Sequence, residues 1–294
     1  MSLVLTTAVR RAAWAGLPAP ALVAAAAVLA LAVIGAAAPM IAPYDPLDQD
    51  LLALNQMPDA VHWLGTDHIG RDVLSRLVMG TRTTLLVGVG GAAAAFAIGA
   101  GLGLLALALG RIVEGLVFGA IDVVRAMPGV LLALLLIVAL GAGVVPVTIA
   151  LGISFAPFFA HVARAAYQRE MAQDYVTAAR MFGGGPLHVL SLHVAPNLVG
   201  VLVTQAAIIL PRCIVTESVL SFLGLGASPD APTWGRMVAD ASRYIEVAPH
   251  TILAPVLAII VLTASLSLLG DHVRQRLDPL RHVRRQSPVE EPTS

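Results

Sequence analysis

Residues 174–197 read DYVTAARMFGGGPLHVLSLHVAPN and form the longest polar-containing interruption between two strongly hydrophobic regions of the chain. The stretch opens with apolar residues at helical spacing, and Asp174 is placed to cap the first turn. Residues 183–186, three glycines and a proline, then stop the helix. A second short helical run ends at Pro196. We predict a helix, a forced turn and a second helix, which together form a compact knob suited to dock a partner.

The rest of the chain has the composition of a polytopic membrane protein. Of its 294 residues, 58% are hydrophobic and 12% are charged, whereas about 25% are charged in a typical soluble domain. The charges cluster and leave long uncharged windows, and about 20 apolar helical residues cross a bilayer core of about 30 Å. The composition therefore predicts an all-α membrane protein.

The uncharged windows and their apolar flanks predict six transmembrane helices, at about residues 20–41, 83–109, 115–140, 146–165, 197–225 and 250–270. The first window is longer than the ~7–15 residues of a signal-peptide core, which favours a retained helix over a cleaved leader. Between the first two spans, residues 69–78 carry an apolar stripe with Asp72 and Arg76 four apart on the other side. This pattern predicts an interfacial helix that leads into the second span.

These spans divide the chain into three parts. Residues 1–81 form an N-terminal region with the first helix and an extracytoplasmic segment. Residues 82–271 form the transmembrane domain, which contains a cytoplasmic loop at 166–196. Residues 272–294 form a cytoplasmic tail.

The arginines predict the orientation of the spans. Lysine is absent, so all 18 basic residues are arginine. If both termini are cytoplasmic, eleven arginines lie inside and five outside, and Arg125 and Arg212 lie within spans, which completes the 18. This excess agrees with the positive-inside rule. We therefore expect a multi-pass protein of the cytoplasmic membrane with the knob in the cytoplasm.

The same composition excludes several classes of function. Without lysine the chain has neither the phosphate-binding lysine of a P-loop nor a Schiff-base lysine. The formal net charge is zero, which gives no sign of nucleic-acid binding. The single Cys213 cannot form an internal disulfide and is predicted to be a small apolar packing residue.

Two pairs of residues could suggest a protease site and a metal site, but their spacing favours neither. Ser154 and His161 share one helical face, whereas an intramembrane serine protease pairs these residues across helices, so Ser154 is predicted to pack. His62 and His68 stand six apart in a turn-rich loop, which is not metal-ligand spacing, and both are predicted to be solvent-exposed.

The knob sequence resembles a known motif. Thr177-Ala178-Ala179, with Gly183 and Pro196 at the expected distances, resembles the EAA loop of ABC importer permeases, which reads Glu-Ala-Ala, three residues, Gly, nine residues, Ile-x-Leu-Pro. Thr177 stands where the family has Glu, and His193 and Ala195 replace the Ile and the Leu. The spacing to Pro196 is kept.

Four other stretches resemble the permeases of dipeptide, oligopeptide and nickel importers, and specifically their second-permease (C-type) subunit. They are residues 64–76, 125–128, 220–235 and 269–279. The resemblance covers about residues 20–280 in order, and it implies the type I ABC importer permease fold.

The resemblance also implies partners and a mechanism. The chain would pair with a homologous permease as a heterodimer, two ABC ATPase subunits would use ATP and Mg²⁺, and an extracytoplasmic binding protein would deliver di- or oligopeptides. Membrane lipid would surround it, and the chain itself would hold no cofactor and catalyse no reaction. The residues implied in contact with the ATPase are Asp174, Tyr175, Thr177, Ala178, Ala179, Arg180, Gly183 and Pro196.

Two questions stay open from sequence. Glu217 within the fifth span, with Arg212 five residues away, is a candidate for the translocation pathway, or Glu217 sits near the outer interface or in a structural pair. The cargo is peptide by resemblance, with nickel, glutathione or an opine as alternatives. A secondary transporter is disfavoured because it would need intramembrane acid or histidine relays and inverted repeats, and the chain shows one candidate carboxylate and no clear repeat.

Overall fold

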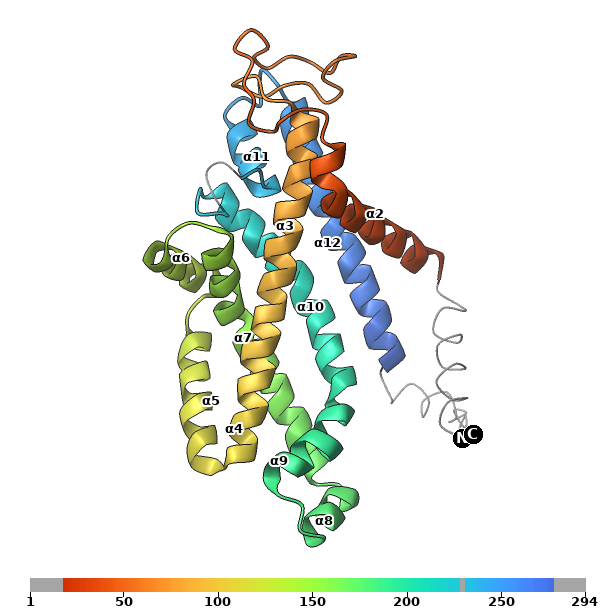
Figure 1. Cartoon of the computed structure of the whole chain (residues 1–294), viewed down its shortest axis with the longest axis vertical. Coiled ribbons are helices and arrows are strands. Elements are labelled where there is room, and N and C mark those ends of the chain that lie inside the picture. The colour runs from red at the N-terminus through yellow and green to blue at the C-terminus, as the bar shows by residue number, and fades with distance from the viewer. Residues whose placement is uncertain (1–17, 228–230, 278–294) are drawn as a thin grey trace, which may run out of the picture.

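The computed structural model describes residues 18–227 and 231–277, and each regular element in these ranges is helical. The loop over residues 42–72 lies at one end of the elongated bundle and the α8–α9 segment at the other (Figure 1). The elements are α2 (Ala19–Ile41), α3 (Val73–Phe96), the π-helical η1 (Ala97–Leu102), α4 (Gly103–Leu109), α5 (Arg111–Ala126), α6 (Gly129–Leu140), α7 (Val144–Met171), α8 (Asp174–Met181), α9 (Pro186–Val189), the π-helical η2 (Leu190–Val194), α10 (Ala195–Phe222), α11 (Trp234–Ser242) and α12 (His250–Leu277).

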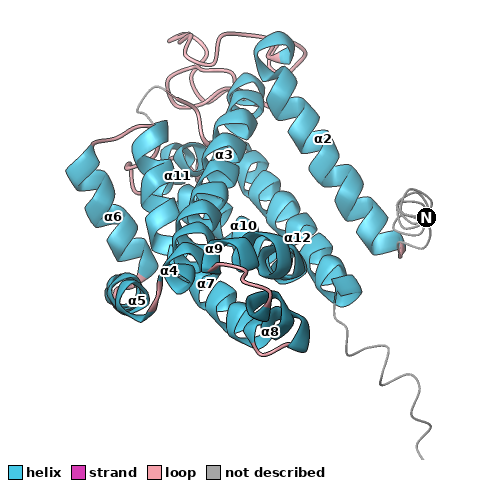
Figure 2. Cartoon of the chain, turned by 60° about the horizontal axis from the view of Figure 1, so that its bottom comes forward, coloured by secondary structure: helices cyan, strands magenta, loops and turns pink. Residues whose placement is uncertain are grey.

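Five helical stretches in the described ranges are long and apolar enough to cross a membrane, and the α5–α6 pair gives a sixth when counted as one broken span. The predicted all-α membrane fold with six spans is therefore confirmed. In the bundle, α2 packs against α3 and α12, on the opposite side from α5 and α6 (Figure 2).

The second span begins ten residues earlier than predicted. The chain is helical without a break from Val73 to Leu109, so the helix predicted to lead into the second span begins at Val73 and is continuous with that span. Asp72 caps this helix, because its Oδ2 accepts the Ser75 N–H at 2.7 Å. Arg76 is compatible with this buried helical position because its guanidinium is paired with two carboxylates, which offsets the cost of burying its charge.

The predicted single span over residues 115–140 is broken in the structure. Helices α5 and α6 meet at an angle of 100°. The cause lies at Met127 and Pro128, since proline has no N–H to donate and restricts the residue before it to extended conformations. Met127 has φ −87° and ψ 140° accordingly.

Three further boundaries differ from the sequence prediction. Helix α7 continues to Met171, past the predicted end of the fourth span at 165, and α12 continues to Leu277, past the predicted end of the sixth at 270. Residues 226–250, predicted to be loop, contain α11 because Thr233 Oγ1 accepts the Arg236 N–H at 3.2 Å and caps it. The predicted division of the chain at 81 and 271 stays a prediction, and residues 10, 11 and 278–294, which carry several of its basic residues, lie outside the described ranges.

The core lies where α3, α7 and α10 cross. One buried cluster joins small residues of α3 and η1 to Phe159 of α7 and Ile209 of α10, both completely buried. Cys213 is part of the same cluster, as its predicted packing role requires. The cluster reaches down to Val176 and Val189 in the α8–α9 segment. The projecting segment is therefore continuous with the core.

Candidate functional site

The projecting segment, residues 172–197, connects α7 to α10 at one end of the bundle (Figure 1). Its inner side is anchored by Val176 and Val189, which are 0% and 1% exposed. Its outer side carries Met181 and Phe182, which are 84% and 92% exposed. The segment is thus a firmly seated knob with an apolar tip. The sequence reasoning missed both tip residues, although their place directly before the glycine turn marks them as the outermost point.

Tyr175 links three parts of this segment. Its hydroxyl donates to Glu170 Oε2 at 2.6 Å and accepts from Asn197 Nδ2 at 2.8 Å. Glu170 belongs to the end of α7 and Asn197 to the start of α10. The bond to the Glu170 carboxylate raises the pKa of Tyr175, because it favours the protonated phenol. Tyr175 therefore fixes the angle at which α8 leaves the bundle.

The turn after α8 depends on its glycines. Gly183 has φ +87°, a conformation that side-chain-bearing residues rarely adopt. A Cβ on Gly183 would meet no atom within 4 Å, whereas one on Gly184 would lie 2.8 Å from the Ala179 carbonyl oxygen. The Gly184 N–H donates to that same oxygen at 3.1 Å. A glycine is thus required at 183 by the backbone conformation, and at 184 by the close approach of the Ala179 carbonyl oxygen.

The other predicted contact residues lie on the same knob. Thr177, Ala178 and Arg180 are exposed, and Ala179 packs partly buried against the core. Asp174 is exposed in the first turn of α8, but the capping position is Gln173 and no side chain caps it, so the predicted cap is wrong.

Pro196 does not end a helix, contrary to the prediction. It lies in the first turn of α10, where a proline is tolerated. The helical course from Pro186 to Phe222 is continuous through the π-turn η2. Motion at the knob is therefore joined to α10 by an unbroken helical path.

A second candidate feature is a cavity of about 650 Å³ that is partly open at the surface of the chain and is lined by α5, α6, α7, α10 and α12. Its charged lining residues are Arg125, Arg212 and Asp271. Ser154, predicted to be a packing residue, is buried and also lines it. The volume falls within the ~300–1,000 Å³ of small-molecule sites.

Glu217, the other candidate pathway residue, does not line this cavity and is completely buried. Its Oε1 accepts from Ser221 Oγ at 2.7 Å and its Oε2 from Ser218 Oγ at 3.4 Å, and Thr84 of α3 is a third hydrogen-bond partner. Within the described ranges it makes no ion pair with Arg212. Of the two candidate pathway residues, Arg212 therefore lines the cavity, whereas Glu217 is enclosed between α3 and α10.

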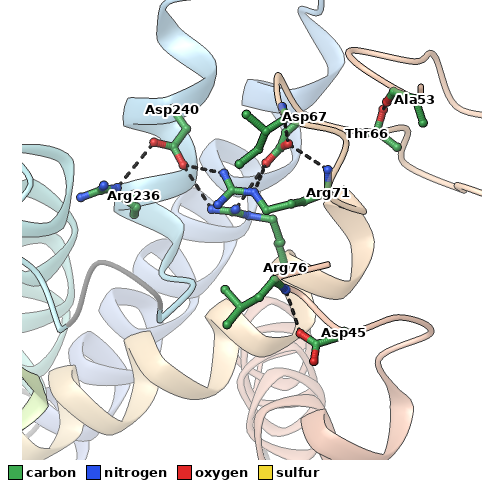
Figure 3. A network of polar contacts seen from close by, with 10 residues as sticks. Asp45, Ala53, Thr66, Asp67, Arg71, Arg76, Arg236 and Asp240 are labelled. Atoms are coloured by element: carbon green, nitrogen blue, oxygen red, sulfur yellow. Dashed lines mark hydrogen bonds and ion pairs between the residues drawn. The ribbon is translucent and has the colours of Figure 1, made fainter. Parts of the chain in front are cut away.

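Opposite the knob, an ion-pair network joins the loop over 42–72 to α3 and α11 (Figure 3). Arg76, only 4% exposed, pairs with Asp67 at 3.3 Å and with Asp240 at 3.2 Å. Arg71 pairs with the same two carboxylates at 2.7 and 3.1 Å. The network clamps α11 onto the start of α3.

His62 and His68 are not freely exposed, contrary to the prediction. His62 Nδ1 lies 2.9 Å from Asp72 Oδ1. His68 stacks on Tyr244 with the ring centroids 4.8 Å apart. Both side chains therefore help to hold the loop in place.

The comparisons with known proteins agree on one family of transport proteins. The model of the binding-protein-dependent transport system inner membrane component matches residues 93–282. The di/tripeptide transport system permease protein DppC of Pseudomonas aeruginosa is 37% identical over 248 residues, 82% of each chain. The dipeptide transport system permease protein DppC of Escherichia coli K12 is 38% identical over 245 residues, 81% of this chain and 82% of the relative. The glutathione transport system permease protein GsiD of Pectobacterium atrosepticum is 36% identical over 253 residues, 86% and 84% of the two chains.

A solved structure shares the fold. An inward-facing conformation of the MetNI methionine ABC transporter matches with a TM-score of 0.57 and 19% identity, over 69% of this chain and 96% of the other. This likeness confirms the predicted type I ABC importer permease fold. Together with the family match, it shows that the chain belongs to the binding-protein-dependent transport system inner membrane components, the membrane-spanning permease subunits of ABC transporters.

Proposed function

We propose that this chain is the permease subunit of an ATP-driven importer that moves di- and oligopeptides across the cytoplasmic membrane. The observation that carries the proposal is the similarity, over four fifths of both chains, to permeases of di/tripeptide and dipeptide transport systems. The chain offers a route for such a cargo in the cavity between α5, α7, α10 and α12.

The knob over residues 172–197 is the proposed contact with an ATPase subunit. Its exposed tip residues Met181 and Phe182 offer apolar surface to a partner, while buried Val176 and Val189 tie it to the core. Closure of the ATPases would then move α7 and α10 together with the knob. ATP and Mg²⁺ are used on the ATPase subunits, and the lysine-free chain holds neither.

The cavity side of the bundle is the proposed contact with a second, homologous permease. Arg125, Arg212 and Asp271 lie exposed on membrane-spanning or broken-span helices. A charge facing lipid near the bilayer centre costs about 2.5–3.5 kcal/mol on insertion scales. A water-filled path enclosed between this chain and the second permease avoids this cost. An extracytoplasmic binding protein completes the assembly and delivers the cargo at the end that carries the ion-pair network.

The orientation follows from the same picture. Six spans put both termini on one side of the membrane, and the arginine distribution favours the cytoplasm as that side. The knob then faces the ATPases, and the loop over residues 42–72 and α11 face the binding protein.

Glutathione is the second candidate cargo, because permeases of glutathione transport systems are as similar to this chain as the dipeptide ones. Glutathione is itself a tripeptide with free carboxylates and an amino group. The two cargoes therefore differ in size and charge rather than in chemical class.

The test is uptake by the complete complex. The chain would be co-expressed with its genomic neighbours, the complex reconstituted in proteoliposomes, and uptake of labelled dipeptide and of labelled glutathione measured with ATP enclosed. ATP-dependent accumulation of the dipeptide supports the proposal, and accumulation of glutathione alone replaces its cargo. Uptake of neither, by a complex that hydrolyses ATP, contradicts it. Purified alone, the chain should bind no ATP, and saturable nucleotide binding would contradict the assignment of ATP use to partner subunits.

A further inference from the structure

The cavity between α5, α7, α10 and α12 has charges and hydroxyls that the fold itself does not use. Arg125 comes from the last turn of α5, Arg212 from α10 and Asp271 from the last two turns of α12. Within the described ranges none of these three side chains makes a hydrogen bond or ion pair. By contrast, Arg71 and Arg76 of the outer network are each paired with two carboxylates.

Ser154 gives an independent sign of a ligand. It is 6% exposed and its Oγ has no hydrogen-bond partner in the described chain. A buried hydroxyl without a partner costs about 1–3 kcal/mol, and helical serines commonly avoid this cost by bonding to a carbonyl of the preceding turn. Ser154 leaves that bond unmade and lines the cavity. A ligand in the cavity can supply the missing partner.

The chemistry of the lining matches an amino acid or peptide terminus. Two guanidinium groups and one carboxylate give the cavity a net positive charge. Guanidinium groups bind carboxylates through paired N–H donors. A carboxylate at mid-bundle can bind an ammonium group. Thr216 and Ser267 add hydroxyls, and Phe155 and Phe158 add apolar wall for a side chain.

We propose that Arg125, Arg212 and Ser154 form a subsite that takes the free carboxylate of the peptide cargo, with Asp271 facing its ammonium group. The proposal rests on the proposed function as a peptide importer and assigns this part of the cavity to the cargo rather than to the neighbouring permease. The broken span supports it, because the 100° bend at Met127–Pro128 ends α5 directly after Arg125 and leaves this arginine at the cavity wall.

The experiment measures binding to the complete complex in nanodiscs, without ATP or binding protein. A labelled dipeptide is displaced either by the same unlabelled dipeptide or by its C-terminal amide, and the ratio of the two Kd values is the readout. The wild-type complex should bind the free acid at least tenfold more tightly than the amide. Arg212→Gln and Arg125→Gln should each weaken binding of the free acid at least fivefold, leave binding of the amide unchanged and move the ratio toward one.

Two control variants sharpen this result. Arg82→Gln removes the same charge from an exposed position of α3 that does not line the cavity, and should leave the ratio at its wild-type value. Arg212→Lys keeps the charge but loses the paired donors, and should retain part of the preference. Ser154→Ala should lower affinity for the free acid and the amide by different factors, with the larger loss for the acid.

Several outcomes would overturn the subsite. One is an unchanged ratio of Kd values in both arginine variants. A second is a loss of complex assembly in both variants, which would assign the arginines to the permease interface. A third is the same loss of preference for the free acid in Arg82→Gln. A wild-type complex that takes up dipeptide but binds acid and amide alike overturns the subsite and leaves the peptide-import proposal standing. A complex that takes up no peptide overturns both.

Discussion

The phenol of Tyr175 donates a 2.6 Å hydrogen bond to Glu170 Oε2 and so ties the projecting knob to the end of α7. Asn197 at the start of α10 donates to the same phenol oxygen at 2.8 Å. One hydroxyl is thus the joint between the two long helices that flank the knob.

Tyr175→Phe removes this joint while keeping the ring. We expect the complex to assemble and to retain basal ATP hydrolysis, but peptide uptake per ATP hydrolysed should fall several-fold, because α8 is no longer fixed to α7 and α10. The loss of a hydrogen bond to a carboxylate also costs about 1.5–3 kcal/mol when buried, and less here because Tyr175 is partly exposed. Tyr244→Phe, whose hydroxyl has no partner in the described chain, is the matched control. Equal coupling in the two variants would contradict the role of the joint.

The Tyr175 bond also predicts a pH dependence. The pKa of Tyr175 is raised, so the stabilising bond is fully present below the ordinary tyrosine pKa of about 10. It is lost only as pH rises through the raised value. Coupling should therefore show no loss from phenol ionisation between pH 7 and 9, measured as uptake per ATP in proteoliposomes. A Tyr175-dependent decline within that window would show that the phenol ionises there.

The backbone turn requires a positive φ at Gly183. The effects of substitutions there should therefore depend on how readily the new residue adopts this φ, and not on the size of its side chain. Gly183→Val should cost more than about 1–2 kcal/mol, because a branched residue is forced to positive φ, and uptake and substrate-stimulated ATP hydrolysis should be lost. Gly183→Asn should be tolerated because asparagine adopts this conformation more readily. Gly185→Ala is the control, since Gly185 has φ −67° and open space. Equal activity of Gly183→Val and Gly185→Ala would argue against the docking role of this turn.

The apolar tip should matter for assembly and not for folding. Phe182→Ser and Met181→Ser remove side chains that are 92% and 84% exposed, so thermal stability of the isolated permease should stay within about 0.5 kcal/mol. Co-purification of ATPase subunits should fall at least tenfold if the tip is buried in the partner. Met40→Ser changes an equally exposed methionine, 88% exposed, at the other end of the bundle. Normal ATPase retention by Phe182→Ser would move the contact elsewhere on the knob.

The outer ion-pair network should contribute to stability. Asp240→Asn weakens the link of α11 to Arg71 and Arg76, and leaves the nearly buried Arg76 with Asp67 alone. We expect a loss of about 1–3 kcal/mol, seen as a lower unfolding temperature in detergent. Asp48→Asn, on the exposed part of the same loop, should have no measurable effect. Unchanged stability in both variants would show that the network does not contribute to the free energy of unfolding.

Glu217 should behave as a structural residue. Glu217→Gln keeps an acceptor for Ser221 and Thr84 and should leave peptide uptake near the wild-type level. Glu217→Ala leaves a buried void and unsatisfied hydroxyls between α3 and α10, and should destabilise the chain by about 2–4 kcal/mol. Strong loss of uptake in a stable, assembled Glu217→Gln complex would return this residue to the translocation pathway.

The sequence predicted the fold through local and additive properties. Uncharged windows fix where helices cross a membrane because burial in lipid depends on summed hydropathy, and the arginine excess favours an orientation for a similar reason. Residues 183–186 were placed in a turn because glycine and proline act locally on the backbone. The sequence pattern did not reveal the ion-pair partner of Arg76, because Asp240 is 164 residues away in the chain.

The features of the candidate sites also divide into those set by local sequence and those set by the packing of helices. The place of the knob, its helix–turn–helix form and the residues of its motif follow from sequence alone, since they lie within 24 consecutive residues. Only the tertiary structure decided that Tyr175 bonds to both flanking helices, that Glu217 is enclosed by hydroxyls, and that Arg125, Arg212 and Asp271 line one cavity. The cavity joins helices far apart in the chain, and in all three cases the geometry is set by how helices and side chains pack, which hydropathy and spacing do not specify.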